Sequence, residues 1–272
     1  MACILLLLGA TASQAGTLAQ FRTVFGDIEV ELFDQDKPGT VQNFIRYVQS
    51  GRYETQISHR LIPGVRLEGG SYVFTNDVPN PISSYAPITN EFGFGPLLSN
   101  VYGTISMGRL PGDTNSATSH WFFNLDDNLS LDAPDADHSF VVFGRVVRGT
   151  NVLNVFRDFQ YFNGFQSSNL VADLTAVYGA EFSECPLRFP SITSTNLLFI
   201  DISLLQVAIT PIAGGREISW NSPANVTNFI EFTTNFPPVW NTLIGTNGNG
   251  SRMSVLDPSV DPKRFYRVRV AY

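Results

Sequence analysis

The feature that most constrains the fold is a run of short apolar segments broken by Gly, Pro and Asn across the middle of the chain. Between residues 57 and 147 these segments read ISHRLIPGVRLEGG, YGTISMGR, HWFFNL and SFVVFGRVV. Short strands with frequent turns and few helices are typical of β-barrels and β-sandwiches. The sequence therefore predicts a mainly β fold.

Two helices are expected to accompany these strands. Residues 23–33, TVFGDIEVELF, alternate apolar with acidic side chains, which predicts a strand with one buried face. In the following segment, 37–51, apolar residues recur at helical spacing between Pro38, which suits a helix start, and Gly51, which suits its end. A second apolar stripe predicts a helix over residues 151–159, whereas residues 159–179 are aromatic and irregular and give no assignment.

The composition indicates a folded, acidic protein. Of the 272 residues 43% are hydrophobic and 15% charged, which is enough apolar material for a core. The net charge of −7 and the lack of a Lys/Arg cluster exclude nucleic acid as an expected partner, because a phosphate backbone would be repelled. No stretch reaches the ~20 apolar residues that a membrane-spanning helix needs.

The first residues predict export. MACILLLLGATASQAGT contains a short apolar run and then a Ser-x-Ala step at 13–15 that suits cleavage. We expect residues 1–15 to be a signal peptide and the protein to be periplasmic or extracellular. The alternative is a buried strand, because no Lys or Arg precedes the apolar run. Loss of Cys3 with the signal would leave Cys185 alone, without a disulfide, as an inert buried thiol.

A change in composition near residue 207 marks a second domain. Residues 208–272 contain four or five short alternating segments split by Gly-Gly, Ser-Pro, Asn-Gly and Asp-Pro turns. This predicts a small all-β sandwich that resembles a fibronectin type III module, with Trp220 in its core. Such modules are spacers or bind a protein or a glycan. The larger domain would occupy residues 20–206, and the strand at 196–205 would close its barrel.

The common catalytic motifs do not occur in the sequence. The three histidines, His59, His120 and His138, lack the spacing of metal ligands, and there is no G-x-S-x-G or P-loop motif. The acidic run at 127–138 begins like a calcium loop but lacks the required Gly and Glu, so a solvated loop is the better interpretation. No metal and no cofactor are predicted.

Several collinear segments resemble the cyclophilin family of peptidyl-prolyl isomerases across residues 20 to 205. They are FGDIEVELFDQDKPGTVQNFIRYVQSGRYE, SHRLIPGVRLEGG, ITNEF, YGTISMGR and NSATSHWFFNLDDNLSLD with SFVVFGRVVRG. The resemblance implies a closed eight-stranded antiparallel barrel capped by two helices, with a proline pocket on one outer face. It also implies that the substrates are proline-containing peptides or unfolded proteins and that no cofactor is needed.

The same resemblance implies which residues form the site. Arg60 matches the catalytic arginine, which would stabilise an X-Pro amide twisted against its rotation barrier of ~18–20 kcal/mol. An arginine in a strand can equally form a structural ion pair. The implied substrate-binding positions are Val65, Glu68, Met107, Gly108, His120, Phe122, Leu131 and Phe140. For Met107 and for the aromatic and leucine side chains among them, ordinary barrel core is the alternative.

Some of these positions depart from the family pattern. Val65, Arg66 and Glu68 stand where the family has Phe, Met and Gln, and Gly108, His120 and Trp121 stand where it has Ala, Gln and Phe. Glu68 matters most, because a carboxylate lacks the amide donor and can pair with Arg60, weakening the positive field at the amide. The alternative is that Glu68 is a tolerated isostere.

Two functions are compatible with these residues. The first is an exported peptidyl-prolyl cis-trans isomerase that acts on X-Pro bonds of exported proteins or peptides. The second is a catalytically weak cyclophilin-fold module for peptide or protein binding, with a pocket reshaped by Val65, Arg66 and Glu68. The two differ in whether Arg60 is free to reach a prolyl amide.

Overall fold

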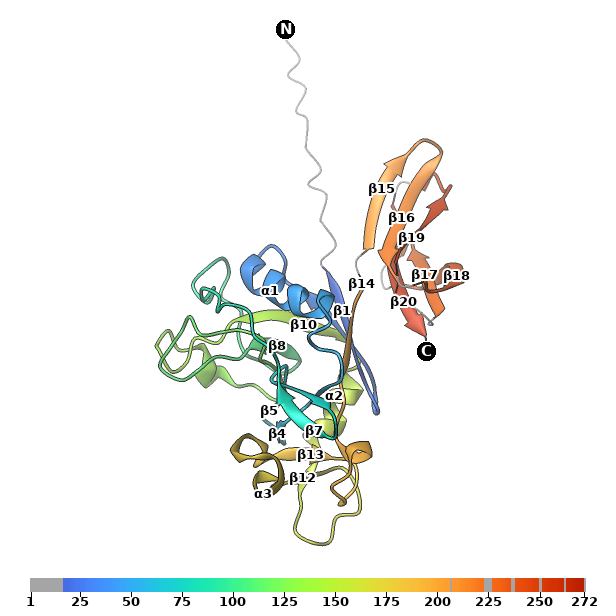
Figure 1. Cartoon of the computed structure of the whole chain (residues 1–272). Coiled ribbons are helices and arrows are strands. Elements are labelled where there is room, and N and C mark those ends of the chain that lie inside the picture. Colours follow the sequence, from blue (N-terminus) through green and yellow to red (C-terminus); the bar gives the residue numbers. More distant parts are fainter. Residues whose placement is uncertain are drawn as a thin grey trace.

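The computed structural model describes residues 17–205, 207–222, 227–235, 238–249, 251–261 and 263–271. Its main element is an eight-stranded antiparallel sheet, in the order β14-β1-β2-β10-β8-β9-β5-β4, which curves into an open half-barrel (Figure 1). Its strands are β1 (Leu18–Thr23), β2 (Gly26–Leu32), β4 (Arg60–Ile62), β5 (Arg66–Gly69), β8 (Thr104–Met107), β9 (Trp121–Asn124), β10 (Val142–Arg148) and β14 (Asp201–Leu205). The predicted mainly β fold is confirmed.

The predicted closed barrel is wrong in one respect. The edge strands β14 and β4 do not pair. The gap is spanned by β3 (Gln56–Ile57), where Ile57 forms an isolated bridge with Phe199 and the Ser58 N–H donates to the Leu198 carbonyl at 2.9 Å. Because β3 belongs to a separate sheet with β6 (Tyr72–Thr75) and β7 (Val78–Pro81), the ladder breaks between β3 and β4.

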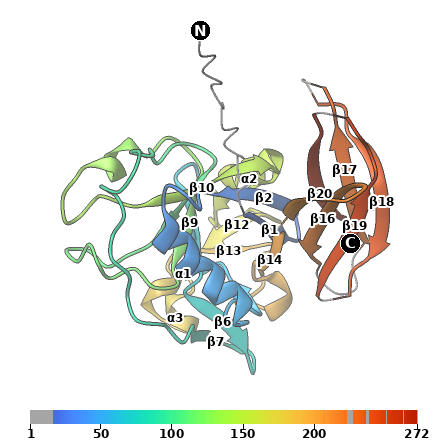
Figure 2. The ribbon, with the colours of Figure 1, turned by 90° about the horizontal axis from the view of Figure 1, so that it is seen from above.

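Both predicted helices are present. They are α1 (Pro38–Gln49) and α2 (Thr150–Arg157), and Figure 2 shows them on opposite sides of β1 and β2. Phe44 of α1 and Phe156 of α2 are fully buried in the same apolar core. The structure adds a short α3 (Thr175–Tyr178) in the stretch that the sequence left unassigned.

The core explains the alternation in β2 and the glycine at the end of β5. Ile28, Val30 and Leu32 are at most 1% exposed, as expected for the inward face of a period-two strand. Trp121 is fully buried in the same core, and a Cβ atom at Gly69 would lie 2.4 Å from its Cζ2 atom. Gly69 therefore makes room for the indole.

A buried lysine ties the long loop at residues 86–100 to α1. Lys37, 1% exposed, donates from Nζ to the carbonyls of Glu91 (2.9 Å), Phe94 and Pro96 (3.1 Å). The Glu91 carboxylate in turn accepts the backbone N–H of Thr40, in the first turn of α1, at 2.7 Å. Both contacts satisfy backbone groups that would otherwise lack partners at a helix start and in a loop.

Replacing Lys37 by Met is expected to lower the free energy of unfolding by about 2–4 kcal/mol, because three carbonyls lose a charged donor. Urea unfolding followed by fluorescence measures the loss. Lys263→Met is the matched control, because Lys263 is the other lysine of the sequence and is exposed. Equal stability of the two variants would show that Lys37 does not anchor the loop.

A small satellite sheet carries the lone described cysteine. It consists of β11 (Gln160–Tyr161), β12 (Leu170–Ala172) and β13 (Cys185–Leu187). Cys185 is fully buried, and burial raises the pKa of its thiol to about 12. The thiol is therefore protonated at neutral pH, in agreement with the expected inert role.

Six strands follow the half-barrel and form two three-stranded sheets, β15-β16-β19 and β18-β17-β20 (Figure 1). They are β15 (Val207–Ile212), β16 (Gly215–Asn221), β17 (Thr227–Thr233), β18 (Asn241–Asn247), β19 (Arg252–Asp257) and β20 (Phe265–Ala271). The predicted core residue Trp220 is 1% exposed and clusters with Ile218, Ile230 and Val268. Leu205 of β14 belongs to the same cluster, which ties these sheets to the half-barrel.

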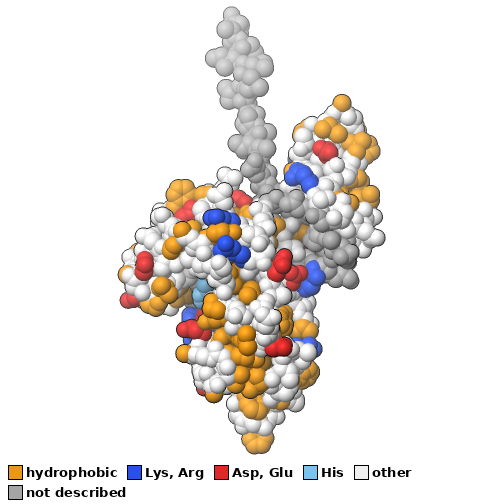
Figure 3. Space-filling model, in the orientation of Figure 1, with side chains coloured by type: hydrophobic (Ala, Val, Ile, Leu, Met, Phe, Trp, Pro, Cys, Tyr) orange, Lys and Arg blue, Asp and Glu red, His pale blue; other side chains and the backbone are white. Residues whose placement is uncertain are grey.

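The surface and the termini add three observations. On the face drawn in Figure 3, Lys and Arg side chains occur in small groups with Asp and Glu nearby rather than in one broad basic area. No helix among the described residues is long and apolar enough to cross a membrane. The predicted signal peptide, residues 1–15, lies outside the described residues.

Candidate functional site

The candidate site lies on the sheet face opposite the core. Across the neighbouring strands β4, β5 and β9, Arg60 pairs with Glu68 and Glu68 pairs with Phe122. The alternate residues Leu67 and Phe123 are fully buried in the core, so the row of Arg60, Glu68 and Phe122 points the other way. Because strands lie ~4.8 Å apart, the backbones of Arg60 and Phe122 are about 10 Å apart with Glu68 between them.

Arg60 is held by two carboxylates. Its Nε donates to Glu184 Oε2 at 2.7 Å and its Nη1 donates to Glu68 Oε1 at 3.3 Å. Burial alone would lower the pKa of Arg60, but the hydrogen bond that Arg60 donates to Glu184 and the charge of Glu68 outweigh it and raise the pKa. The guanidinium is therefore permanently charged, and its side chain remains 34% exposed at the edge of the sheet.

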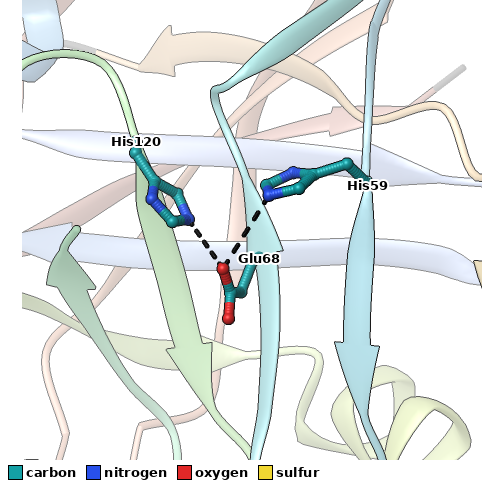
Figure 4. A group of neighbouring side chains, drawn as sticks. All are labelled: His59, Glu68 and His120. Carbon is teal, nitrogen blue, oxygen red and sulfur yellow. Dashed lines mark ion pairs between the residues drawn. The ribbon is translucent and has the colours of Figure 1, made fainter. Parts of the chain in front are cut away.

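Glu68 is a buried carboxylate shared by several partners. It is 4% exposed, and its Oε1 accepts a hydrogen bond from Arg66 Nε at 2.6 Å. Its Oε2 lies 3.0 Å from His120 Nε2 and 3.8 Å from His59 Nε2, as Figure 4 shows. Burial would raise the pKa of Glu68, but His120 and Arg66 dominate and lower it well below its usual range. Glu68 is thus ionised and acts as an acceptor, unlike the amide that the family carries there.

The position of His120 explains a second departure from the family pattern. A Cβ atom at Gly108 would lie 2.5 Å from both Cγ and Nδ1 of the His120 ring. The alanine of the family would therefore clash with His120 in this position. Gly108 and His120 are coupled, and together they bring an imidazole next to Glu68.

The apolar side chains predicted to bind proline also lie together. The Phe122 ring packs edge-on against Phe140 with centroids 5.6 Å apart, and the Phe140 N–H donates to the Leu131 carbonyl at 3.2 Å. Phe122 is 3% exposed yet lies outside the apolar cluster of the half-barrel, while Leu131 and Phe140 are half-buried. These three side chains form a small apolar group next to the charged row.

Comparison with known proteins identifies the family. The family model described as cyclophilin type peptidyl-prolyl cis-trans isomerase/CLD matches residues 18–171, more than half of the chain. The chain belongs to this family. The sequence is 41% identical over 143 residues to peptidyl-prolyl cis-trans isomerase A of Dickeya dadantii, covering 53% of this chain and 72% of that protein.

Other relatives carry the same activity in their names. The chain is 37% identical over 148 residues to a peptidyl-prolyl cis-trans isomerase of Acinetobacter baylyi, covering 54% of this chain and 76% of that protein. It is 34% identical over 140 residues to peptidyl-prolyl cis-trans isomerase B of Escherichia coli, covering 50% of this chain and 82% of that protein. By family and by relatives, this cyclophilin-type protein is a peptidyl-prolyl cis-trans isomerase, as the sequence resemblance implied.

Two of the remaining predicted positions, Met107 and Val65, lie outside this row of paired residues. Met107 is 2% exposed, pairs with Trp121 across β8 and β9, and lies in the core; its role in substrate binding stays a prediction. Val65 lies in the turn between β4 and β5, where its carbonyl accepts hydrogen bonds from the Leu125 N–H and from Asn128 Nδ2, both at 2.9 Å. Val65 therefore anchors this turn of the cyclophilin sheet through its backbone.

Sequence reasoning missed two residues of the site. Glu184 immediately precedes β13, in a segment for which the sequence made no prediction, and reaches Arg60 from there. His59 precedes the catalytic-arginine position and lies against Glu68 and His120, its ring centroid 5.4 Å from that of His120. No local signal marks either residue, because their roles depend on pairing between distant segments.

Proposed function

We propose that this cyclophilin-type isomerase acts on X-Pro bonds of exported proteins or peptides, with Arg60 as the catalytic cation. The observation that supports the proposal is the row of Arg60, Glu68 and Phe122 across three neighbouring strands. A proline ring on Phe122, beside Leu131 and Phe140, would bring the preceding amide toward the guanidinium.

The proposed chemistry is rotation of a single bond. An X-Pro amide isomerises in tens to hundreds of seconds without help, because its C–N bond has partial double-bond character. A fixed N–H donor that meets the prolyl nitrogen, whose lone pair is exposed only when the amide is twisted, stabilises the transition state more than the ground state. Arg60 would supply this donor, and the apolar pocket would hold the ring.

The contacts of Arg60 favour a second candidate function. Its Nε and Nη1 are already bound to Glu184 and Glu68, so a substrate amide has to compete with two carboxylates. A module that binds proline-containing peptides and turns them over only weakly is therefore the alternative. Both functions use the same pocket and differ in rate.

Cis-to-trans exchange of a short X-Pro peptide, measured by NMR with and without the full chain, tests the proposal. We expect exchange well above the spontaneous rate. Peptide resonances that shift on binding while exchange stays at the background rate, over several X-Pro sequences, would establish the binding module instead.

Export and the role of the C-terminal sheets are further parts of the proposal. Residues 1–15 have the pattern of a signal peptide. We expect mass spectrometry of the periplasmic or extracellular protein to show a mature chain that begins after residue 15.

We propose domains at residues 20–206 and 208–272. The second domain would be a fibronectin type III-like sandwich that binds a protein or glycan, supported by its two three-stranded sheets around Trp220.

A further inference from the structure

We propose that His59, Glu68 and His120 form a binding site for a transition-metal dication of the Zn²⁺ class. One ligand atom from each residue lies within 4.8 Å of the other two. Figure 4 shows both imidazoles directed at the same carboxylate. Glu68 lies on β5, and His59 and His120 lie just before the neighbouring strands β4 and β9.

The donor set is that of a catalytic-type zinc site. Two imidazole nitrogens and one carboxylate oxygen bind Zn²⁺ at ~2.0–2.2 Å and leave a fourth position open. Tetrahedral geometry places such donor atoms about 3.3 Å apart. The contacts of Glu68 Oε2 with His120 Nε2 at 3.0 Å and with His59 Nε2 at 3.8 Å bracket that value. All three ligand atoms lie within 4.8 Å of one another, so side-chain movements that bring them closer would complete the site.

His59 is the more deeply buried of the two imidazoles in this cluster. It is 3% exposed, and among the described residues its Nδ1 has no hydrogen-bond partner. Its Nε2 points into the cluster but lies beyond hydrogen-bond range of Glu68. His120 Nε2 is also buried and faces Glu68 Oε2 at 3.0 Å. At 3.8 Å the His59 Nε2 makes no hydrogen bond to Glu68, and a metal ion between the three side chains would bind Nε2 of both rings.

The surrounding charges leave one carboxylate oxygen for the metal. Arg66 and Arg60 both contact Glu68 Oε1, on the opposite side of the carboxylate from the imidazoles. Arg60 is also balanced by Glu184, at 2.7 Å. With two arginines against two glutamates, the neighbourhood is neutral before a cation enters. The His120 side chain is 30% exposed, which gives the ion a route from solvent.

Two departures from the family pattern create this site and a third makes room for it. Glu68 and His120 each replace a glutamine, which supplies no zinc ligand comparable to a carboxylate or an imidazole. Gly108 leaves space for the His120 ring, since a Cβ atom there would lie 2.5 Å from it. Substitutions that restore the family's residues at positions 68, 108 and 120 should therefore remove or weaken the site.

Titration of the full chain, without an affinity tag and in a Cys3→Ser background, with Zn²⁺ by calorimetry and with Co²⁺ by visible absorption tests the site. We expect one Zn²⁺ per chain with a Kd of about 1 µM or below and Co²⁺ bands typical of a low-coordinate site. His120→Gln and Glu68→Gln should each weaken binding more than about 100-fold. Gly108→Ala, which removes no ligand but displaces one, should weaken it about 10- to 100-fold.

His138→Gln is the matched control, because His138 pairs with Asp135 on the surface and does not belong to the cluster of His59, Glu68 and His120. It should leave binding unchanged. No Zn²⁺ binding by the parent chain would overturn the proposal, as would binding that survives both His120→Gln and Glu68→Gln. Circular dichroism and urea unfolding establish that the variants are folded, and the metal titrations need no isomerase assay.

Discussion

Replacing Arg60 by Ala is expected to lower kcat/KM for an X-Pro peptide by about 10²- to 10³-fold, the loss typical of removing one preorganised donor from an active site. The expectation rests on the position of Arg60, at the edge of the sheet and in line with Phe122. Arg60→Lys should fall between the parent and the Ala variant, because it keeps the charge but loses the planar set of donors. NMR exchange at several enzyme concentrations gives kcat/KM directly.

Arg145→Ala is the control for this loss. Arg145 also forms an ion pair from a strand of the same sheet, with Glu31 at 2.8 Å, but its side chain is 61% exposed. It should leave turnover unchanged. If Arg60→Ala retained the parent's kcat/KM while remaining folded, Arg60 would be the structural ion pair that the sequence also allowed.

Replacing Glu68 by Gln is expected to raise kcat/KM about tenfold when metal is removed with EDTA. A hydrogen bond to a charged group contributes roughly 1.5–3 kcal/mol, and losing it frees Arg60 to meet the substrate amide. The gain is expected at the lower end of that range, because Glu184 still holds Arg60 Nε. Gln also restores an amide donor next to Phe122.

Glu31→Gln, which breaks the surface pair with Arg145, is the matched control and should leave turnover at the parent value. EDTA matters because Glu68 is also a ligand of the proposed metal site. An unchanged or lower kcat/KM for Glu68→Gln would show that the carboxylate does not restrain Arg60.

The sequence predicted those parts of the fold that depend on local pattern. Alternation in residues 23–33 and helical spacing after Pro38 arise within one element, and both elements are present as β2 and α1. Barrel closure was predicted wrongly because it depends on whether the edge strands β14 and β4, which are far apart in the sequence, pair with each other. The family resemblance placed Arg60, Glu68 and Phe122, which the strand register then brought into one row.

The other residues of the site could not be predicted from their spacing along the sequence. Glu184 comes from a stretch without periodicity, and it meets Arg60 only because β13 lies beside β4. His59 and His120 are far apart in the sequence and become neighbours of Glu68 because β4, β5 and β9 are adjacent in the sheet. A motif search for metal ligands tests spacing along one chain segment and cannot detect ligands from separate strands.

The most direct test of the account is a double-mutant cycle of Arg60→Ala and Glu68→Gln, with kcat/KM for one X-Pro peptide measured by NMR exchange in EDTA. If Glu68 restrains catalysis through Arg60, the gain from Glu68→Gln disappears in the Arg60→Ala background, and the coupling equals that gain. An equal gain in both backgrounds would show that Glu68 acts independently of Arg60 and would contradict the account.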